Sequence, residues 1–225
     1  RELKNFTPDF VARKSVACFG NRIICLGSGI SNSNVNYPTE TTLFQCALPA
    51  KYQPAVLEDS CTLKDPFGNY FYIQKGKPHQ TEGLQHSFHN KSRKATEGKF
   101  LTAWIDHGKA PQNAEYEYLI LLRPTEKERK EARQSYIIKQ QDCQAHIVFD
   151  KLTQVTACSF FEAYQNTQAD LIQQADAETL VMYKKNESGI QLSICSPNLN
   201  IEEKTYTPSQ PSRPVVKQIT IKGKW

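Results

Sequence analysis

Short apolar runs separated by turn residues dominate the chain. Residues 16–19 and 23–26 are apolar runs on either side of Gly20-Asn21, a pair that favours a tight two-residue turn. A stretch rich in Gly, Ser and Asn follows, and a strand-like pattern resumes at residues 41–45. This pattern predicts a hairpin, a long polar loop and a returning strand.

Most of the remaining chain has the same character. The further runs rich in aromatic or β-branched residues are 70–74, 115–122, 145–150, 180–184, 191–195 and 215–225. Short strands separated by Pro, Gly and Asn turns are typical of antiparallel sandwiches. The sequence therefore predicts a mainly β chain.

One surface helix is predicted at residues 126–139. Thr125 and Glu128 have the spacing of a capping box, and Glu126 with Lys130 has the i,i+4 spacing of a favourable ion pair. The narrow apolar face of this helix consists of Ala132, Tyr136 and Ile137.

The domain organisation is predicted from a weak helical pattern at residues 167–177, which is interpreted as a connector. Residues 1–166 then form a central β-sandwich, and residues 178–225 form a small C-terminal β domain. The first residue is Arg1 and the chain ends directly after a strand-like run. We therefore expect the first domain to be incomplete at its N-terminus and the last to be truncated.

Composition is ordinary for a globular chain of 225 residues, with 39% hydrophobic and 23% charged residues. The net charge of +5 attracts polyanions, although on charge alone an ordinary solvated surface is the preferred interpretation, and the densest basic stretch is residues 91–99. No apolar run approaches the roughly 20 residues that span a bilayer. The seven cysteines form no CxxC pair and are expected to be buried free thiols.

Few residues have the spacing of a catalytic or metal site. His79, His86 and His89 lie close in sequence but lack a partner at a zinc spacing, so no metal and no cofactor are predicted. Asp106-His107 could be an acid–base pair, but adjacent strand residues point to opposite faces. If Gly108 turns the chain, one of the two side chains instead fixes that turn.

Two stretches carry a more specific signal. They are KSVACFGNRIICLGSGISNSNVNYPTETTLFQ, residues 14–45, and TEGKFLTAWIDHGKAPQNAEYEYLILL, residues 96–122. The amino-acid sequences of these two stretches resemble the β-sandwich region of the polysaccharide lyases that cleave hyaluronan and chondroitin, most closely the chondroitin sulfate ABC lyases. The resemblance implies part of a super-sandwich followed by a small C-terminal sandwich.

The resemblance also implies an activity, the β-elimination of glycosaminoglycans by a larger bacterial enzyme. Most catalytic groups of that family lie on an upstream helical toroid, and none maps onto this sequence. Glu40 lacks the tryptophan-rich context of the family's catalytic glutamate and is interpreted as a loop-anchoring acid. No catalytic residue is therefore expected within these 225 residues, and the isolated chain is expected to be inactive.

Substrate contact is predicted from charge and from the second stretch. The candidates are Arg93, Lys94, Lys99, Asp106 and His107. Arg13, Lys14, Arg22 and Lys91 are further cations that could hold sulfate or carboxylate. Tyr37, Phe100 and Trp104 could stack on sugar rings, although Phe100 and Trp104 are expected to be core residues.

The implied partners are chondroitin sulfate, dermatan sulfate or hyaluronan chains and the helical toroid of the same protein, with no nucleic acid and no membrane. The implied location is periplasmic or secreted. Two alternatives remain open at this point. One is a stand-alone, non-catalytic polysaccharide-binding module, and the other is a structural or adhesin sandwich without a ligand.

Overall fold

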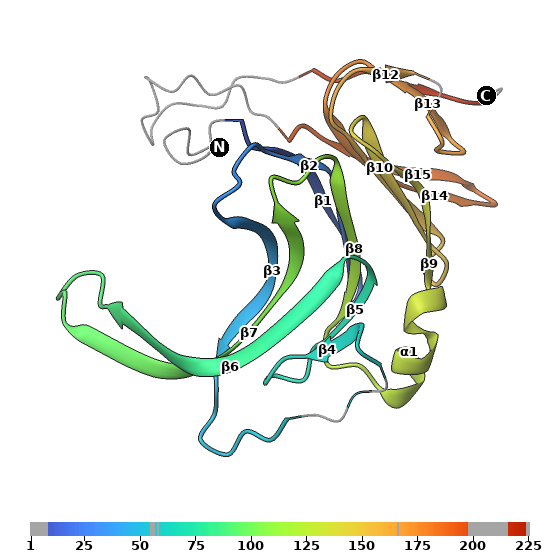
Figure 1. Cartoon of the computed structure of the whole chain (residues 1–225). Coiled ribbons are helices and arrows are strands. Elements are labelled where there is room, and N and C mark those ends of the chain that lie inside the picture. Colours follow the sequence, from blue (N-terminus) through green and yellow to red (C-terminus); the bar gives the residue numbers. More distant parts are fainter. Residues whose placement is uncertain (1–8, 55–56, 58, 166, 198–215, 224–225) are drawn as a thin grey trace. The chain divides into compact units, whose positions relative to one another are not determined.

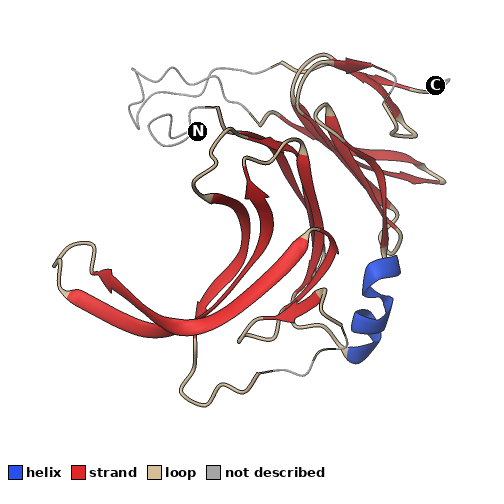
Figure 2. Cartoon of the chain, in the orientation of Figure 1, coloured by secondary structure: helices blue, strands red, loops and turns tan. Residues whose placement is uncertain are grey.

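The computed structural model describes residues 9–54, 57, 59–165, 167–197 and 216–223. Strands dominate the described chain, with one short α-helix (Figure 2). The chain forms two compact units, residues 1–133 and 134–225. All sheet pairings are antiparallel, so the predicted mainly β, antiparallel architecture is confirmed.

The first unit contains two sheets, drawn in Figure 1. Sheet A has the strand order β1 (Val11–Phe19), β2 (Arg22–Ser31), β8 (Ala114–Leu121), β5 (Tyr70–Lys75) and β4 (Thr62–Lys64). Sheet B has the order β3 (Pro38–Ala47), β7 (Ala95–Lys109) and β6 (Lys77–Phe88).

The predicted hairpin is confirmed by the pairing of β1 with β2. Phe19 lies opposite Arg22, and Gly20 has φ +62°, which suits the two-residue turn. The returning strand is β3, which leaves sheet A and pairs with β7 in sheet B. The polar stretch between them is therefore a crossover from one layer to the other.

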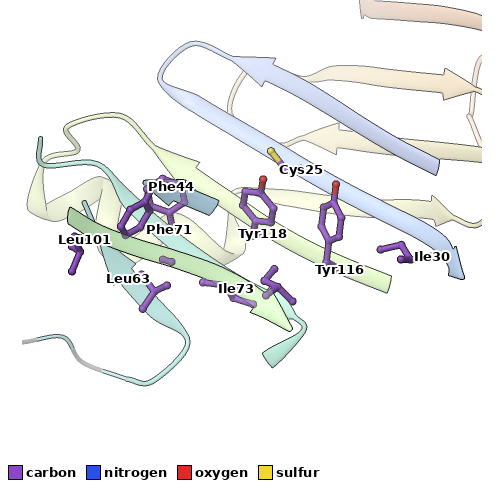
Figure 3. Packing of buried hydrophobic residues seen from close by; sticks show 11 residues of the cluster. Cys25, Ile30, Phe44, Leu63, Phe71, Ile73, Leu101, Tyr116 and Tyr118 are labelled. Atoms are coloured by element: carbon purple, nitrogen blue, oxygen red, sulfur yellow. The ribbon is translucent and has the colours of Figure 1, made fainter. Parts of the chain in front are cut away.

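A hydrophobic core lies between sheets A and B. Its members from sheet B include Phe44, Leu101 and Ile105, and its members from sheet A include Tyr116 and Tyr118. Figure 3 shows the two tyrosines side by side on β8, with Cys25 of β2 near Tyr118. Gly27 is required where the ring of Tyr116 crosses β2, because a Cβ there would overlap the ring.

Strands β6 and β7 continue well beyond the rest of sheet B. β3 pairs with β7 only from Lys109 to Phe100, whereas β6 pairs with β7 as far as Ala95. The last part of this hairpin therefore projects as a two-stranded arm (Figure 1).

The second unit also contains two sheets. Sheet C has the order β15 (Gly189–Cys195), β14 (Thr179–Asn186), β11 (Val155–Phe160), β10 (Ala145–Asp150) and β9 (Tyr136–Gln141). Sheet D has the order β12 (Tyr164–Gln165), β13 (Ile172–Ala175) and β16 (Ile219–Ile221). A second core joins the two sheets and includes Ile147, Phe160 and Ile172.

The helix is shorter than predicted. α1 spans Glu126–Glu131, and its capping box at Thr125 and its ion pair between Glu126 and Lys130 are both present. A 3₁₀ turn, Ala132–Gln134, then ends it, and Tyr136 starts strand β9. The predicted apolar helix face at Tyr136 and Ile137 was wrong, because pairing with β10 outweighs a weak local helical preference.

The predicted connector, residues 167–177, lies within the second unit. It supplies strand β13, and its apolar residues Leu171 and Ile172 are buried in the second core. The prediction for residues 215–225 is met only at β16, and residues 215, 224 and 225 lie outside the described residues.

All seven cysteines are free thiols. Only Cys25 and Cys158 are buried, whereas Cys18, Cys143 and Cys195 are exposed, so the expectation of buried thiols was wrong for these three. Burial raises the pKa of Cys25 to about 11 and that of Cys158 to about 12. Both buried thiols are therefore protonated and unreactive at neutral pH.

Candidate functional site

The predicted contact residues lie at two ends of strand β7. Arg93 and Lys94 lie in the turn that leads into it, Lys99 lies in the arm, and Asp106 and His107 lie near its other end. At about 3.4 Å per residue, Arg93 and Asp106 are separated by roughly 40 Å along the strand. These residues cannot contact one sugar together, but one extended polymer could reach both ends.

The arm end is basic. The guanidinium of Arg93 lies 5.7 Å from the centre of the Phe88 ring, and Arg93 itself has φ 55° in the tight turn. No carboxylate of the described residues forms an ion pair with Arg93, Lys94 or Lys91. Lys99 differs, because its Nζ lies 2.8 Å from Glu82 Oε1 across the strand pair. Its charge is already compensated.

Asp106 bonds the backbone at the other end of β7. Its Oδ1 accepts a hydrogen bond of 2.8 Å from the backbone N–H of Gly108, which has φ +75°. Its Oδ2 lies 4.0 Å from His79 Nε2, too far for a hydrogen bond. Gly108 lies within β7 and not in a turn, so the predicted turn is absent there, and the Asp106 side chain bonds the backbone of the strand itself.

His107 points to the opposite face of the strand, as predicted. Its Nε2 lies 2.8 Å from the hydroxyl of the buried Thr41, which ties β7 to β3. Burial lowers the pKa of His107, and the charge of Lys14 lowers it further. His107 is thus a neutral, half-buried hydrogen-bonding group at pH 7, separated from Asp106 by the strand itself.

Sheet B has two different faces. Leu101, Ala103 and Ile105 point into the core, so we call their side the inner face. The alternate residues of β7 make the outer face, and cross-strand pairing adds their neighbours from β3 and β6. This outer face consists of Thr42, Gln45, His79, Thr81, Gln85, Phe100, Thr102 and Trp104.

Aromatic rings lie at two places on the outer face, one around Trp104 and one at Phe100. The indole of Trp104 stacks on the imidazole of His79 at 5.5 Å and 15°, and both residues are half-buried. The ring of Phe100 lies over Gly98, where a Cβ would come within 3.0 Å of the ring. The expectation that Phe100 and Trp104 are core residues was therefore wrong, because strand parity places both on the outer face.

Polar side chains connect these rings. Gln45 Nε2 donates to Gln85 Oε1 at 2.5 Å, and Gln85 Nε2 donates to the hydroxyl of Thr102 at 3.1 Å. Thr102 lies between Phe100 and Trp104 in the sequence of β7. The chain of amides thus crosses all three strands of the sheet between the two aromatic rings.

Carboxylates mark one end of the outer face. Glu40 pairs in register with Asp106, and Lys77 lies opposite Asp106 on the other side. Glu40 is exposed and lies within strand β3, so its interpretation as a loop-anchoring acid was wrong.

Other candidates are not brought together. His79 and His86 lie on opposite faces of β6, and His89 lies in the following turn. The described part of the chain contains no group of three or more metal-ligating residues. Of the further cations, Arg22 is buried in β2. Within the described residues, no helix has the length and apolarity to cross a membrane.

The stacking partner of Trp104, His79, was not predicted from the sequence. The stretch around His79 has almost no apolar alternation, so it was not among the strands predicted from the sequence. It is β6, an edge strand of sheet B. The available signal was a mostly polar stretch that could pair with the strand containing Trp104. This signal does not give the register that places His79 opposite Trp104.

Comparison with known proteins adds the context of this surface. Residues 2–133 match the family model described as "Polysaccharide lyase family 8, super-sandwich domain". The chain is 39% identical over 206 residues to the chondroitin sulfate ABC exolyase of Proteus vulgaris, covering 84% of this chain and 20% of that protein. It is 32% identical over 246 residues to the chondroitin sulfate ABC endolyase of the same organism, with 99% and 23% covered.

Solved structures agree on the fold. The chondroitin AC lyase of Streptomyces coelicolor A3 in complex with chondroitin sulphate superposes with a TM-score of 0.71 at 20% identity, covering 85% of this chain and 26% of that one. At this identity the likeness shows the fold alone. The chain spans about a fifth to a quarter of the length of the curated relatives, with 20%, 23% and 24% covered in three of them.

Proposed function

The chain belongs to polysaccharide lyase family 8, and from this premise we propose that it is the super-sandwich part of a lyase that cleaves chondroitin-type glycosaminoglycans by β-elimination. In this role it supports a helical catalytic domain and forms one wall of the substrate cleft. The observation that carries the proposal is the similarity to an ABC exolyase, which extends over 84% of the chain and is not confined to one motif.

The chemistry of β-elimination explains why the chain needs a partner domain. The uronate carboxylate must be neutralised so that a base can remove the proton at C5, and an acid must protonate the departing oxygen. In this chain Asp106 is bonded to the Gly108 backbone and His107 to Thr41, on opposite faces of β7. Neither arrangement aims a base and an acid at a common point.

A segment exchange tests the proposal. The matching segment of the Proteus vulgaris ABC exolyase is replaced by this chain, and absorbance of the unsaturated uronate is followed with chondroitin sulfate. We expect the chimera to produce unsaturated uronate and the chain alone to give a flat trace. Sustained product from the chain alone would show that catalytic groups lie within it and would contradict the proposed division of labour. A folded chimera without activity would contradict the supporting role.

A second candidate function is a polysaccharide-binding module that works without a catalytic domain. The outer face of sheet B favours it, because residues of this sheet alone form an aromatic and amide surface. This candidate predicts glycan binding by the chain alone and no activity in the chimera.

The ligands proposed for either function are chondroitin or dermatan sulfate or hyaluronan. Because such polymers are extracellular, the proposed location is periplasmic or secreted. Cell fractionation with an antibody against the chain tests this, and recovery only in the cytoplasm would contradict it.

A further inference from the structure

The side chain of Trp104 is held in place before any ligand binds. Its indole is held by stacking on His79, and its backbone lies in the middle of a three-stranded sheet. The side chain is nevertheless half-buried and not part of the core. An aromatic ring that is fixed before binding loses little conformational entropy when a ligand covers it.

Polar side chains beside the Trp104 ring offer hydrogen-bonding groups. In the chain Gln45–Gln85–Thr102, the donors of the two described bonds are the amide nitrogens. The carbonyl oxygen of Gln45 and the hydroxyl hydrogen of Thr102 have no other partner among the described residues. An acceptor and a donor therefore lie between the rings of Phe100 and Trp104, where a ligand rich in hydroxyl groups can use both.

The middle of the outer face differs in charge from its two ends. The outer face between Thr42 and Gln85 carries no Lys, Arg, Asp or Glu, whereas Glu40 and Asp106 lie at one end beside a single lysine, Lys77, and Lys91, Arg93 and Lys94 lie beyond the other. A polymer with a charge on every residue would bring an anion against Glu40 and Asp106. Hyaluronan and unsulfated stretches of chondroitin alternate an uncharged N-acetylhexosamine with an anionic uronate, and so can place an uncharged ring at the middle and an anion toward the arm.

We infer that the outer face of sheet B is a glycosaminoglycan-binding surface, on which an uncharged hexosamine ring stacks on Trp104. Gln45 and Thr102 bond its hydroxyl or amide groups, Phe100 contacts the next part of the polymer, and the basic turn at residues 91–94 attracts the neighbouring anionic groups. This inference rests on the proposed function, which supplies the class of ligand, and it names the residues that hold it.

The composition of the chain permits a direct experiment. The chain has two tryptophans, Trp104 and Trp225, so a Trp225→Phe background makes Trp104 the only source of indole fluorescence. An unsulfated chondroitin hexasaccharide is titrated into the 225-residue chain, and the emission of Trp104 is followed beside calorimetry. We expect a saturable change in emission with the same Kd as calorimetry gives.

Variants then locate the surface. Trp104→Ala is expected to raise the calorimetric Kd by about tenfold or more, and Gln85→Ala, which keeps the indole, by a smaller factor. The matched control is Leu84→Ala, an exposed apolar side chain on the inner side of the same strand pair. It is expected to leave Kd unchanged within about twofold. Circular dichroism checks that each variant is folded.

Three outcomes would overturn the inference: hexasaccharide binding with unchanged Trp104 emission, an equal loss in Leu84→Ala, and no binding by calorimetry. If the chimera cleaves chondroitin sulfate while Trp104 reports nothing, only this inference fails. If Trp104 reports binding while the chimera is inactive, the binding surface stands and the lyase role fails.

Discussion

The two faces of strand β7 share one backbone and differ in almost everything else. On the inner face, Ala103 and Ile105 are fully buried and Leu101 is 2% exposed. On the outer face, Thr102 and Trp104 are half-buried and bonded or stacked to residues of neighbouring strands. The difference indicates that the core of the sandwich rests on one face of the strand, whereas the other face keeps polar and aromatic side chains accessible. The following predictions test that division.

The largest effect is expected on the inner face. Ile105→Ala removes a fully buried side chain from the core, and the resulting cavity should reduce the free energy of unfolding by about 2–5 kcal/mol. Urea denaturation followed by Trp104 fluorescence, in the Trp225→Phe background, measures it. The matched control is Thr81→Ala on the exposed outer side, which should cost less than about 1 kcal/mol. Equal costs for the two would refute the division between the faces.

A smaller effect is expected where the outer face ends. Asp106→Ala removes the acceptor for the Gly108 N–H and should cost about 1 kcal/mol of stability. Asp106→Asn keeps an oxygen in that position and should cost much less. If the two variants are equally destabilised, the carboxylate charge matters and the bond to the Gly108 N–H does not.

Stability is expected to depend on pH through His107, which lies on the inner face. Burial lowers the folded-state pKa of His107 below its ordinary value of 6.5, so below that value the unfolded chain binds more protons than the folded one. Stability should therefore fall as pH drops from 6.5 toward the folded-state pKa, and level off below it. Denaturation at about pH 7.5 and about pH 5.5 should show a loss that His107→Gln reduces. His86→Gln, at an exposed position, should leave the loss unchanged.

The smallest effect is expected at the base of the arm, where an exposed ion pair joins β6 to β7. Glu82→Gln breaks the ion pair with Lys99, whose side chains are 36% and 66% exposed, and should change stability by less than about 0.5 kcal/mol. Comparing denaturation midpoints at low and high salt measures it. A loss comparable to that of Ile105→Ala would show that the arm is part of the cooperative core.

Local signals in the sequence predicted several elements well. The Gly20-Asn21 turn, the capping box at Thr125 and Glu128, and the opposite orientations of Asp106 and His107 all follow from bonds between near neighbours. Each is fixed within a few residues, so a local pattern is sufficient to specify it.

What depends on distant pairing could not be predicted. The residues around Tyr136 were expected to continue the helix, and they instead pair with β10. The stacking of His79 on Trp104 requires the register of β6 on β7, which polar residues do not encode. The candidate surface was therefore visible in the sequence only as isolated residue types, and its arrangement came from the structure.

The polarity of β6 has a consequence for the behaviour of the protein in concentrated solution. β6 is a twelve-residue strand at the margin of its sheet, and an exposed margin of that length can recruit another chain into a growing sheet. It contains no valine or isoleucine, and Lys77, Pro78, Glu82 and Gly83 interrupt it. Charges, a missing backbone donor and a flexible glycine all disfavour intermolecular strand pairing. The features that made β6 hard to recognise as a strand thus also protect the protein against aggregation.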